Sequence, residues 1–271
     1  SANDGWIDLR TLTGGVTSTA DATINSITVG KGANSVAGNT VVGETALDSG
    51  SVSGGNNTAI GKNTLTALTS GAANTAVGED ALKANTTESN NTAVGFEALT
   101  TNTQSNNTAV GWQAGKLNTT GIITAIGRRA LLNNTTGNYN TGVGYQAAST
   151  HTTGDNITAI GHNALQQNTT GAGNTALGAN ALDANTTANE NTAVGYQAAS
   201  ANTTGAANTA IGHNSFDANT TGGSNVAIGA QSLSGNTTAS NNVAVGAFCL
   251  RDNSTGASNT GVGITTFNNI F

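Results

Sequence analysis

One short motif, Asn-Thr-Ala-Val-Gly, recurs in near copies almost to the end of the sequence. Most neighbouring copies follow a 17-residue period, as from Gly61 to Gly78. The interval is one residue longer just before Gly61 and one residue shorter on either side of Gly111. The glycines that close the copies are Gly43, Gly61, Gly78, Gly95, Gly111, Gly127, Gly144, Gly161, Gly178, Gly195, Gly212, Gly229, Gly246 and Gly263. A fixed period is typical of repeat proteins, in which each copy packs only on its neighbours, so we expect one elongated array.

The composition excludes several classes of protein. The chain of 271 residues has 37 glycines, no proline, one cysteine and only 8% charged residues, with a net charge of -6. Its bases are scattered, and Arg128-Arg129 is the only adjacent pair, whereas nucleic-acid binding requires clustered Lys and Arg. No apolar run approaches the roughly 18 residues that a membrane-spanning helix needs. We expect neither a nucleic-acid partner nor membrane insertion.

Each repeat has room for two short strands. In the unit from Gly78 to Val94, one expected strand is residues 91–94 and the other runs from Ala81 towards Thr87. Asn, Thr and Gly are weak helix formers, so a helical repeat is disfavoured. In the first strand the period of two places Thr92 and Val94 on one face and Ala93 on the other. The sequence thus predicts an all-β fold, a parallel β-solenoid (β-roll) of about 14 rungs.

We expect the larger aliphatic side chains to fill the interior. The predicted core combines the residue before each glycine with a leucine four residues after it: Val77, Val94, Val110, Ile126, Val143, Ile160, Leu177, Val194, Leu82, Leu99, Leu131, Leu165 and Leu182. Gly115, Ala148 and Ala199 interrupt the leucine series. Small residues at these positions would either leave room for neighbouring side chains or thin the coil locally.

A coil made from one such short repeat encloses few side chains, so we expect several copies to associate laterally. The alanine between Thr and the aliphatic residue would face outward and permit close approach. The predicted interface is Ala59, Ala76, Ala93, Ala109, Ala125, Ala159, Ala176, Ala193 and Ala210.

The two ends depart from the repeat. We expect residues 1–29 to form an N-terminal connector or cap, residues 30–263 the solenoid array, and residues 264–271 a C-terminal cap or truncated end. The first residue is Ser, so we also expect a processed chain or a fragment.

The extended repeat, as in residues 174–187 and 191–205, resembles the repeat arrays of phage tail fibres of the marine and cyanobacterial type. The Asn-Val-Ala-Ile-Gly of residues 225–229 is also similar to head repeats of trimeric autotransporter adhesins. These resemblances imply a β-roll assembled as a homotrimer. They further imply a place in the virion, beside other tail proteins, or alternatively on a bacterial cell surface.

No catalytic or metal-binding constellation stands out, and we expect no enzyme activity, cofactor or metal. The position after each glycine is the variable one, and it carries aromatic or basic residues on several copies. The predicted receptor-contact stripe is Phe96, Trp112, Arg128, Tyr145, His162 and Tyr196, followed by His213. Aromatic rings with an Arg between them suit sugar faces and anions. A host surface glycan or protein is therefore the expected receptor. The alternative is that Gly-Tyr-Gln-Ala is a common variant of the repeat and that the stripe only stabilises the rod.

Together these features predict a structural fibre protein, a virion tail fibre segment that provides reach and host attachment. A bacterial trimeric adhesin stalk or head is the alternative. A remoter alternative is an ice-binding solenoid, because a second threonine series recurs at Thr86, Thr119, Thr135, Thr169, Thr186, Thr203, Thr220 and Thr237. Adjacent threonines point to opposite faces of a strand, which disfavours a two-rank ice-binding array.

Overall fold

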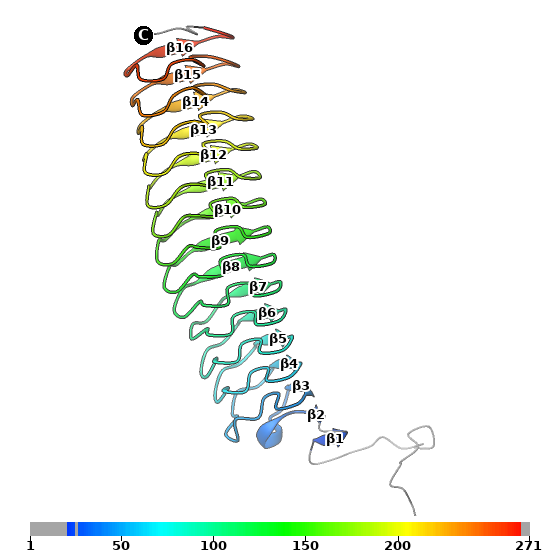
Figure 1. The fold of residues 1–271 in the computed structure, drawn as a ribbon. Helices are drawn as coiled ribbons and strands as arrows, with labels where there is room; N and C mark the ends of the chain where they lie inside the picture. Colours follow the sequence, from blue (N-terminus) through cyan, green and yellow to red (C-terminus); the bar gives the residue numbers. More distant parts are fainter. Residues whose placement is uncertain (1–20, 25–26, 267–271) are drawn as a thin grey trace, which may run out of the picture.

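The computed structural model describes residues 21–24 and 27–266 and shows an all-β solenoid of about 13 turns (Figure 1). We call each solenoid turn a coil. Besides one 3-10 turn at Ala33–Ser35, the elements are short strands. They are β1 (Ala22–Ile24), β2 (Ile27–Gly30), β3 (Thr40–Gly43), β4 (Thr58–Ile60), β5 (Thr75–Val77), β6 (Thr92–Val94), β7 (Thr108–Val110), β8 (Ile123–Ile126), β9 (Asn140–Val143), β10 (Thr158–Ile160), β11 (Thr175–Leu177), β12 (Thr192–Val194), β13 (Thr209–Ile211), β14 (Val226–Ile228), β15 (Val243–Val245) and β16 (Thr260–Val262).

The strands form one sheet in sequence order. β1 pairs antiparallel with β2 and β2 antiparallel with β3, after which every pair is parallel. Equivalent residues of successive repeats stand side by side, as in Thr192 beside Thr209 and Ala193 beside Ala210. At about 4.8 Å per strand, the parallel stack is about 60 Å long. Each 17-residue repeat thus forms one coil, and the stacked coils form a rod.

The faces of these strands are the reverse of the prediction. The alanine series Ala59, Ala76, Ala93, Ala109, Ala125, Ala159, Ala176, Ala193 and Ala210 is buried inside the coil at 0% exposure. An alanine series enclosed within its own chain has no surface to offer another copy, so the predicted interface is wrong.

The aliphatic series that we expected in the core lies on the outer face. Val77, Val94, Val143, Ile160 and Val194 are only partly buried, and Val110, Ile126 and Leu177 are exposed. The reason is the narrowness of the coil. In the coil where Gly142 replaces the alanine, an added Cβ would lie 2.9 Å from the Leu131 Cγ atom. The leucines already fill most of the interior, so from β4 onwards the inward position of each strand is alanine or glycine, whereas β3 carries the buried Val41 there.

The leucine half of the predicted core is confirmed. Leu82, Leu99, Leu131, Leu165 and Leu182 are all fully buried. They do not lie on a second strand, however, and each coil has a single strand of three or four residues. The leucines adopt left-handed backbone conformations, with φ of 51° at Leu82 and 50° at Leu182. Backbone hydrogen bonds still join successive coils there, for example from Leu65 N to Ala81 O at 3.2 Å.

Small residues in the leucine series are compensated in two of three coils. An added Cβ at Gly115 would lie 2.7 Å from Ile123 Cδ1, so the isoleucine occupies the missing leucine's space. Ile157, also fully buried, follows Ala148 in the same way. Both isoleucines stand where most coils have an asparagine. Ala199 has no such partner, because the equivalent residue is Asn208.

Two columns of buried asparagines run along the interior. In one, each side-chain oxygen accepts from the backbone of the next coil, as Asn174 Oδ1 does from Asn191 N at 2.9 Å. In the other, most amides donate to the previous asparagine and to a carbonyl three residues ahead, as Asn185 does to Asn168 and Ala188. Buried polar groups need such partners. Asparagine side chains therefore link successive coils by hydrogen bonds.

His151 replaces an asparagine in the second column. Its Nε2 atom is 2.7 Å from Gly154 O, and its Nδ1 atom is 2.8 Å from Asn168 Nδ2. The residue is fully buried, and this burial lowers the pKa of the imidazole below its ordinary value. A neutral ring with Nε2 protonated satisfies both contacts, donating at Nε2 and accepting at Nδ1.

The ends of the chain are only partly described. Most of the predicted N-terminal cap, including Trp6, and residues 267–271 of the predicted C-terminal segment lie outside the described residues. Cys249 is fully buried in the position that is alanine in most coils, with its sulfur 2.9 Å from Thr266 Oγ1. The thiol therefore packs as a small core side chain.

Candidate binding surface

The residue after each closing glycine lies at the end of a strand, where the chain leaves the sheet. The glycine has a φ near +130°, as in Gly111 at 137° and Gly195 at 137°. A Cβ on Gly195 would lie 2.5 Å from Gly212 O of the next coil. Only glycine fits this turn, and it places the following side chain on the outer surface of the rod.

Five consecutive coils bring the predicted stripe together. The Phe96 and Trp112 rings are stacked with centroids 6.3 Å apart and an interplanar angle of 12°. The Tyr145 and His162 rings are stacked at 5.3 Å and 8°. These pairs follow from the spacing of parallel strands, which sets like residues of adjacent coils one above the other.

Arg128 fills the gap between the two aromatic pairs. Its guanidinium carbon is 4.7 Å from the Trp112 centroid and 5.4 Å from the Tyr145 centroid. Its Nη1 atom also donates to the Tyr145 hydroxyl at 2.9 Å. A cation over an exposed aromatic ring contributes roughly 0.5–1 kcal/mol. The stripe from Phe96 to His162 is thus a continuous stack across five coils.

Tyr196 does not join this stack. Ala179 occupies the intervening coil, and Tyr196 instead stacks on His213 at 5.5 Å and 19°. The sequence prediction therefore describes two patches, a long one over residues 96–162 and a short one at residues 196 and 213.

Arg129 belongs to the long patch, although the sequence prediction omitted it. Its guanidinium carbon is 4.9 Å from the Trp112 centroid. Its Nε atom donates to Gln113 Oε1 at 3.3 Å, and Gln113 donates in turn to Glu97 Oε2 at 2.7 Å. The sequence does distinguish Arg129, because Arg128-Arg129 is the only pair of adjacent basic residues.

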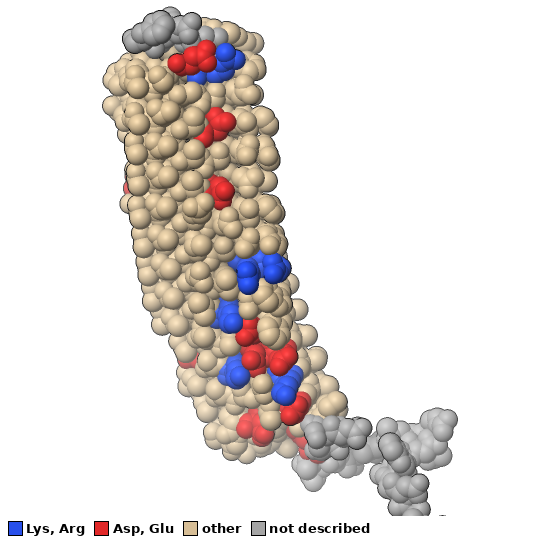
Figure 2. All heavy atoms as spheres, viewed as in Figure 1, with Lys and Arg blue, Asp and Glu red and all other residues tan. Residues whose placement is uncertain are grey.

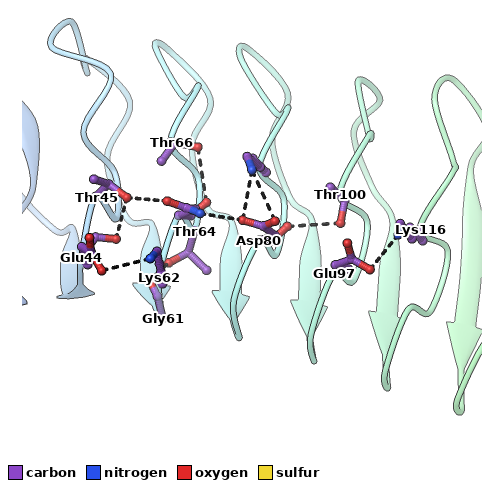
Figure 3. Close-up of polar contacts among 12 residues, drawn as sticks. Glu44, Thr45, Gly61, Lys62, Thr64, Thr66, Asp80, Glu97, Thr100 and Lys116 are labelled. Carbon is purple, nitrogen blue, oxygen red and sulfur yellow. Dashed lines mark hydrogen bonds and ion pairs between the residues drawn. The ribbon is translucent and has the colours of Figure 1, made fainter.

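The two arginines differ from Lys62, Lys83, Lys116 and Arg251, each of which forms an ion pair with an acidic side chain. Ion pairs join Lys62 to Glu44 at 3.3 Å and Lys116 to Glu97 at 2.7 Å, each across successive coils (Figure 3). The hydrogen bond from Lys116 lowers the pKa of Glu97, so this carboxylate stays ionised and paired. Within the described part of the chain, neither Arg128 nor Arg129 has an acidic partner.

Figure 2 shows this contrast on the rod surface, where a basic patch near the middle stands apart from the acidic residues. Mixed acidic and basic side chains gather towards the N-terminal end in the same view. In a chain of net charge -6, the middle of the long patch is thus locally positive.

The threonines on which the ice-binding alternative rests use their hydroxyl groups in hydrogen bonds within the solenoid. Thr119 donates its hydroxyl to Thr135 O at 2.7 Å, and Thr203 donates to Thr220 O at 2.9 Å. The same bond recurs along this series. These hydroxyls tie one coil to the next, so this series does not form a free hydroxyl array.

The structure describes residues 21–24 and 27–266. That part of the chain contains no group of three His, Cys, Asp or Glu side chains placed to hold a metal ion. Nor does it contain a helix long and apolar enough to cross a membrane. The long patch is therefore the feature of the described surface with the clearest capacity for recognition.

Comparisons with models of protein families, with curated proteins and with solved structures found no match to this chain.

Proposed function

We propose that this chain is the shaft of a structural fibre, a virion tail fibre segment that provides reach and carries a surface for host attachment. The observation that carries the proposal is the unbroken parallel stack from β3 to β16. A parallel stack joined by backbone hydrogen bonds and two asparagine columns is long and stiff. Such a rod suits mechanical extension, and the repeat resemblance to tail fibres supports this role. A bacterial trimeric adhesin stalk or head would use the same properties.

The shaft acts as a homo-oligomer, and its outer aliphatic column forms the contact between copies. This column consists of Ile60, Val77, Val94, Val110, Ile126, Val143, Ile160, Leu177, Val194, Ile211, Ile228 and Val245. A threonine or valine lies two residues before each of these, on the same outer face. Neither column contains a charged residue over the length of the parallel stack.

Large contiguous apolar patches on soluble proteins mark interaction surfaces. An apolar column about 60 Å long and about 6 Å wide covers on the order of 360 Å² before the threonine methyl groups are counted. Because the partner would be an identical rod with the same repeat, the two columns match in spacing along their whole length. Three copies is the number implied by the adhesin-head resemblance.

Paired substitutions test this association. Val194→Glu with Ile211→Glu places two charges on the outer column, where contact with another copy would bury them without partners. Ala73→Glu with Ala207→Glu adds the same charge at exposed positions of the turn region, where Glu190 already stands in another coil. Analytical ultracentrifugation should give a trimer for the wild type and the control, and a folded monomer for the outer-column variant.

A wild-type rod that remains a folded monomer at high concentration contradicts the homo-oligomer. Thermal hysteresis by such a monomer would instead favour the ice-binding alternative, with the threonine and aliphatic columns of the sheet as the active face. Far-UV circular dichroism of each variant establishes that the solenoid itself is intact.

Attachment through the long patch is tested by the double variant Trp112→Ala with Tyr145→Ala. Both rings are on the outer surface and in contact with Arg128, so their removal dismantles the stack without entering the core. Phe248→Ala is the matched control, because Phe248 is an exposed aromatic beside Arg251 outside the patch. On a glycan array, the double variant should lose binding that the control retains. Equal binding by all three proteins would remove the patch from the proposal.

A further inference from the structure

The donors of Arg128 and Arg129 point to the class of ligand. A guanidinium has five N–H donors. Arg128 uses one on the Tyr145 hydroxyl, and Arg129 uses one on Gln113, as far as the described residues show. Both groups approach the same indole, at 4.7 and 4.9 Å from its centroid. Two oriented cations therefore keep most of their donors for a ligand.

The cluster is held in place before any ligand arrives. Trp112 and Tyr145 lie on either side of Arg128, and the chain of contacts from Glu97 through Gln113 orients Arg129. Glu97 is itself engaged by Lys116, so it is not available to neutralise the arginines. Two adjacent guanidinium groups with no acidic partner in the described chain repel each other, and a bound anion would relieve that repulsion.

The surroundings of the cations select a sugar as the carrier of the anion. Phe96 and His162 extend the aromatic surface on both sides of the arginines. Flat aromatic faces pack on sugar rings, while the planar fork of arginine matches the two oxygens of a carboxylate or a sulfate. A single-stranded nucleic acid would need a basic groove along its backbone. After Arg129, the next Lys or Arg towards the C-terminus is Arg251, which is paired with Asp252. The rod therefore lacks the continuous basic groove that a nucleic acid would need.

We propose that Trp112, Arg128, Arg129 and Tyr145 form a binding site for the anionic group of an acidic polysaccharide, either a carboxylate or a sulfate ester. The inference rests on the proposed attachment function and adds the charge of the ligand. The arginines hold the anionic group, and the flanking rings hold the sugar.

Three dextrans that share one backbone provide the probes: dextran sulfate, carboxymethyl dextran and neutral dextran, which carry sulfate esters, carboxylates and no charged group. Biolayer interferometry with the whole chain should show at least tenfold tighter binding to one or both charged dextrans than to neutral dextran. The two charged probes separate a sulfate site from a carboxylate site. The preference should weaken as salt concentration rises.

Variants assign this binding to the cluster. Arg128→Gln with Arg129→Gln should lower affinity for the charged dextran at least tenfold. Arg128→Lys with Arg129→Lys keeps the charge but removes the planar fork, and should give an intermediate loss. Arg251→Gln, an exposed arginine outside the patch, should leave binding unchanged.

Equal affinity for charged and neutral dextran would overturn the anionic ligand while leaving attachment to neutral glycans intact. Equal loss in the Arg251→Gln control would show charge attraction without a site, and would also overturn it. The failure of the proposed shaft is seen separately, in the oligomeric state of the wild type beside that of the outer-column variant. Thermal unfolding of each variant excludes loss of fold as the cause.

Discussion

Ala193 and Val194 are neighbours on strand β12, yet they belong to opposite regions of the molecule. Ala193 is enclosed among the buried leucines and asparagines, whereas Val194 stands on the outer face beside Thr192. From β4 onwards the inner column contains only alanine and glycine, because the leucines leave room for little more than a methyl group. The outer column varies among valine, isoleucine and leucine, since only the environment outside the coil limits its size. The difference shows that available volume, more than hydrophobicity, decides which face turns inward.

The largest expected difference in the free energy of unfolding is between alanine substitutions at two leucines of one coil. Leu182 is fully buried, whereas Leu177 on the outer column is 45% exposed. Leu182→Ala should lower the free energy of unfolding by about 2–5 kcal/mol, because it removes buried contacts and leaves a cavity. Leu177→Ala should change it by about 0.5 kcal/mol or less in the isolated monomer. Urea unfolding followed by circular dichroism measures both.

Ala148 and Ala199 already occupy the Leu182 position in other coils, so the Leu182→Ala variant is expected to fold. Equal destabilisation by the two variants would mean that the outer column is also buried, as in a tight assembly. Repeating the measurement on the outer-column monomer variant distinguishes these cases.

A smaller effect is expected from enlarging each column. Ala193→Leu should destabilise the fold by about 1–3 kcal/mol, because the added carbons meet an interior that is already filled. Val194→Leu should be nearly neutral for the monomer, as Leu177 occupies the equivalent position one coil earlier. Differential scanning calorimetry compares the two. A stable Ala193→Leu variant would contradict the narrow interior that reverses the strand faces.

The smallest effect concerns the two environments of histidine. Burial lowers the pKa of His151 from its ordinary value of 6.5, so the unfolded chain binds a proton more readily than the folded chain. The contribution of His151 to the free energy of unfolding is therefore fully present above about pH 6.5. It declines as the pH falls from there towards the lower pKa of the folded chain. His151→Asn restores the asparagine column and should remove this decline.

His162→Asn is the matched control, since His162 is exposed on the long patch and should leave the acid dependence in place. Thermal unfolding of the wild type and both variants between about pH 7.5 and about pH 5 makes the comparison. An unchanged acid dependence in His151→Asn would place its origin in another group, such as the carboxylates.

Several features of the fold followed from the repeat alone. The regular spacing of Gly61, Gly78 and Gly95 predicts a parallel stack, and the leucine four residues after each glycine predicts a buried column. The stripe after the glycines was also predictable, because in-register stacking must place Phe96 beside Trp112 and Tyr145 beside His162. These results depend only on periodicity, which the sequence carries directly.

Other features could not be derived from periodicity. Alternation places Thr92 and Val94 on one face, but it does not say which face is inside. The length of the repeat also suggested a second strand through Leu82, whereas the chain there adopts a left-handed conformation and the leucine is buried. The pairing of Gly115 with Ile123 depends on which side chains meet across the coil.

The sequence by itself determined that this protein is a β-solenoid, how far apart its coils are, and which variable side chains stack along its surface. Only the tertiary structure decided that alanine lines the interior, that valine faces outward, and that Arg129 joins Arg128 on the Trp112 ring. The physical reason is that a repeat fixes the order of neighbours along the rod. The volume enclosed by each coil depends on which side chains meet across the coil, and the spacing of the repeat does not specify those contacts.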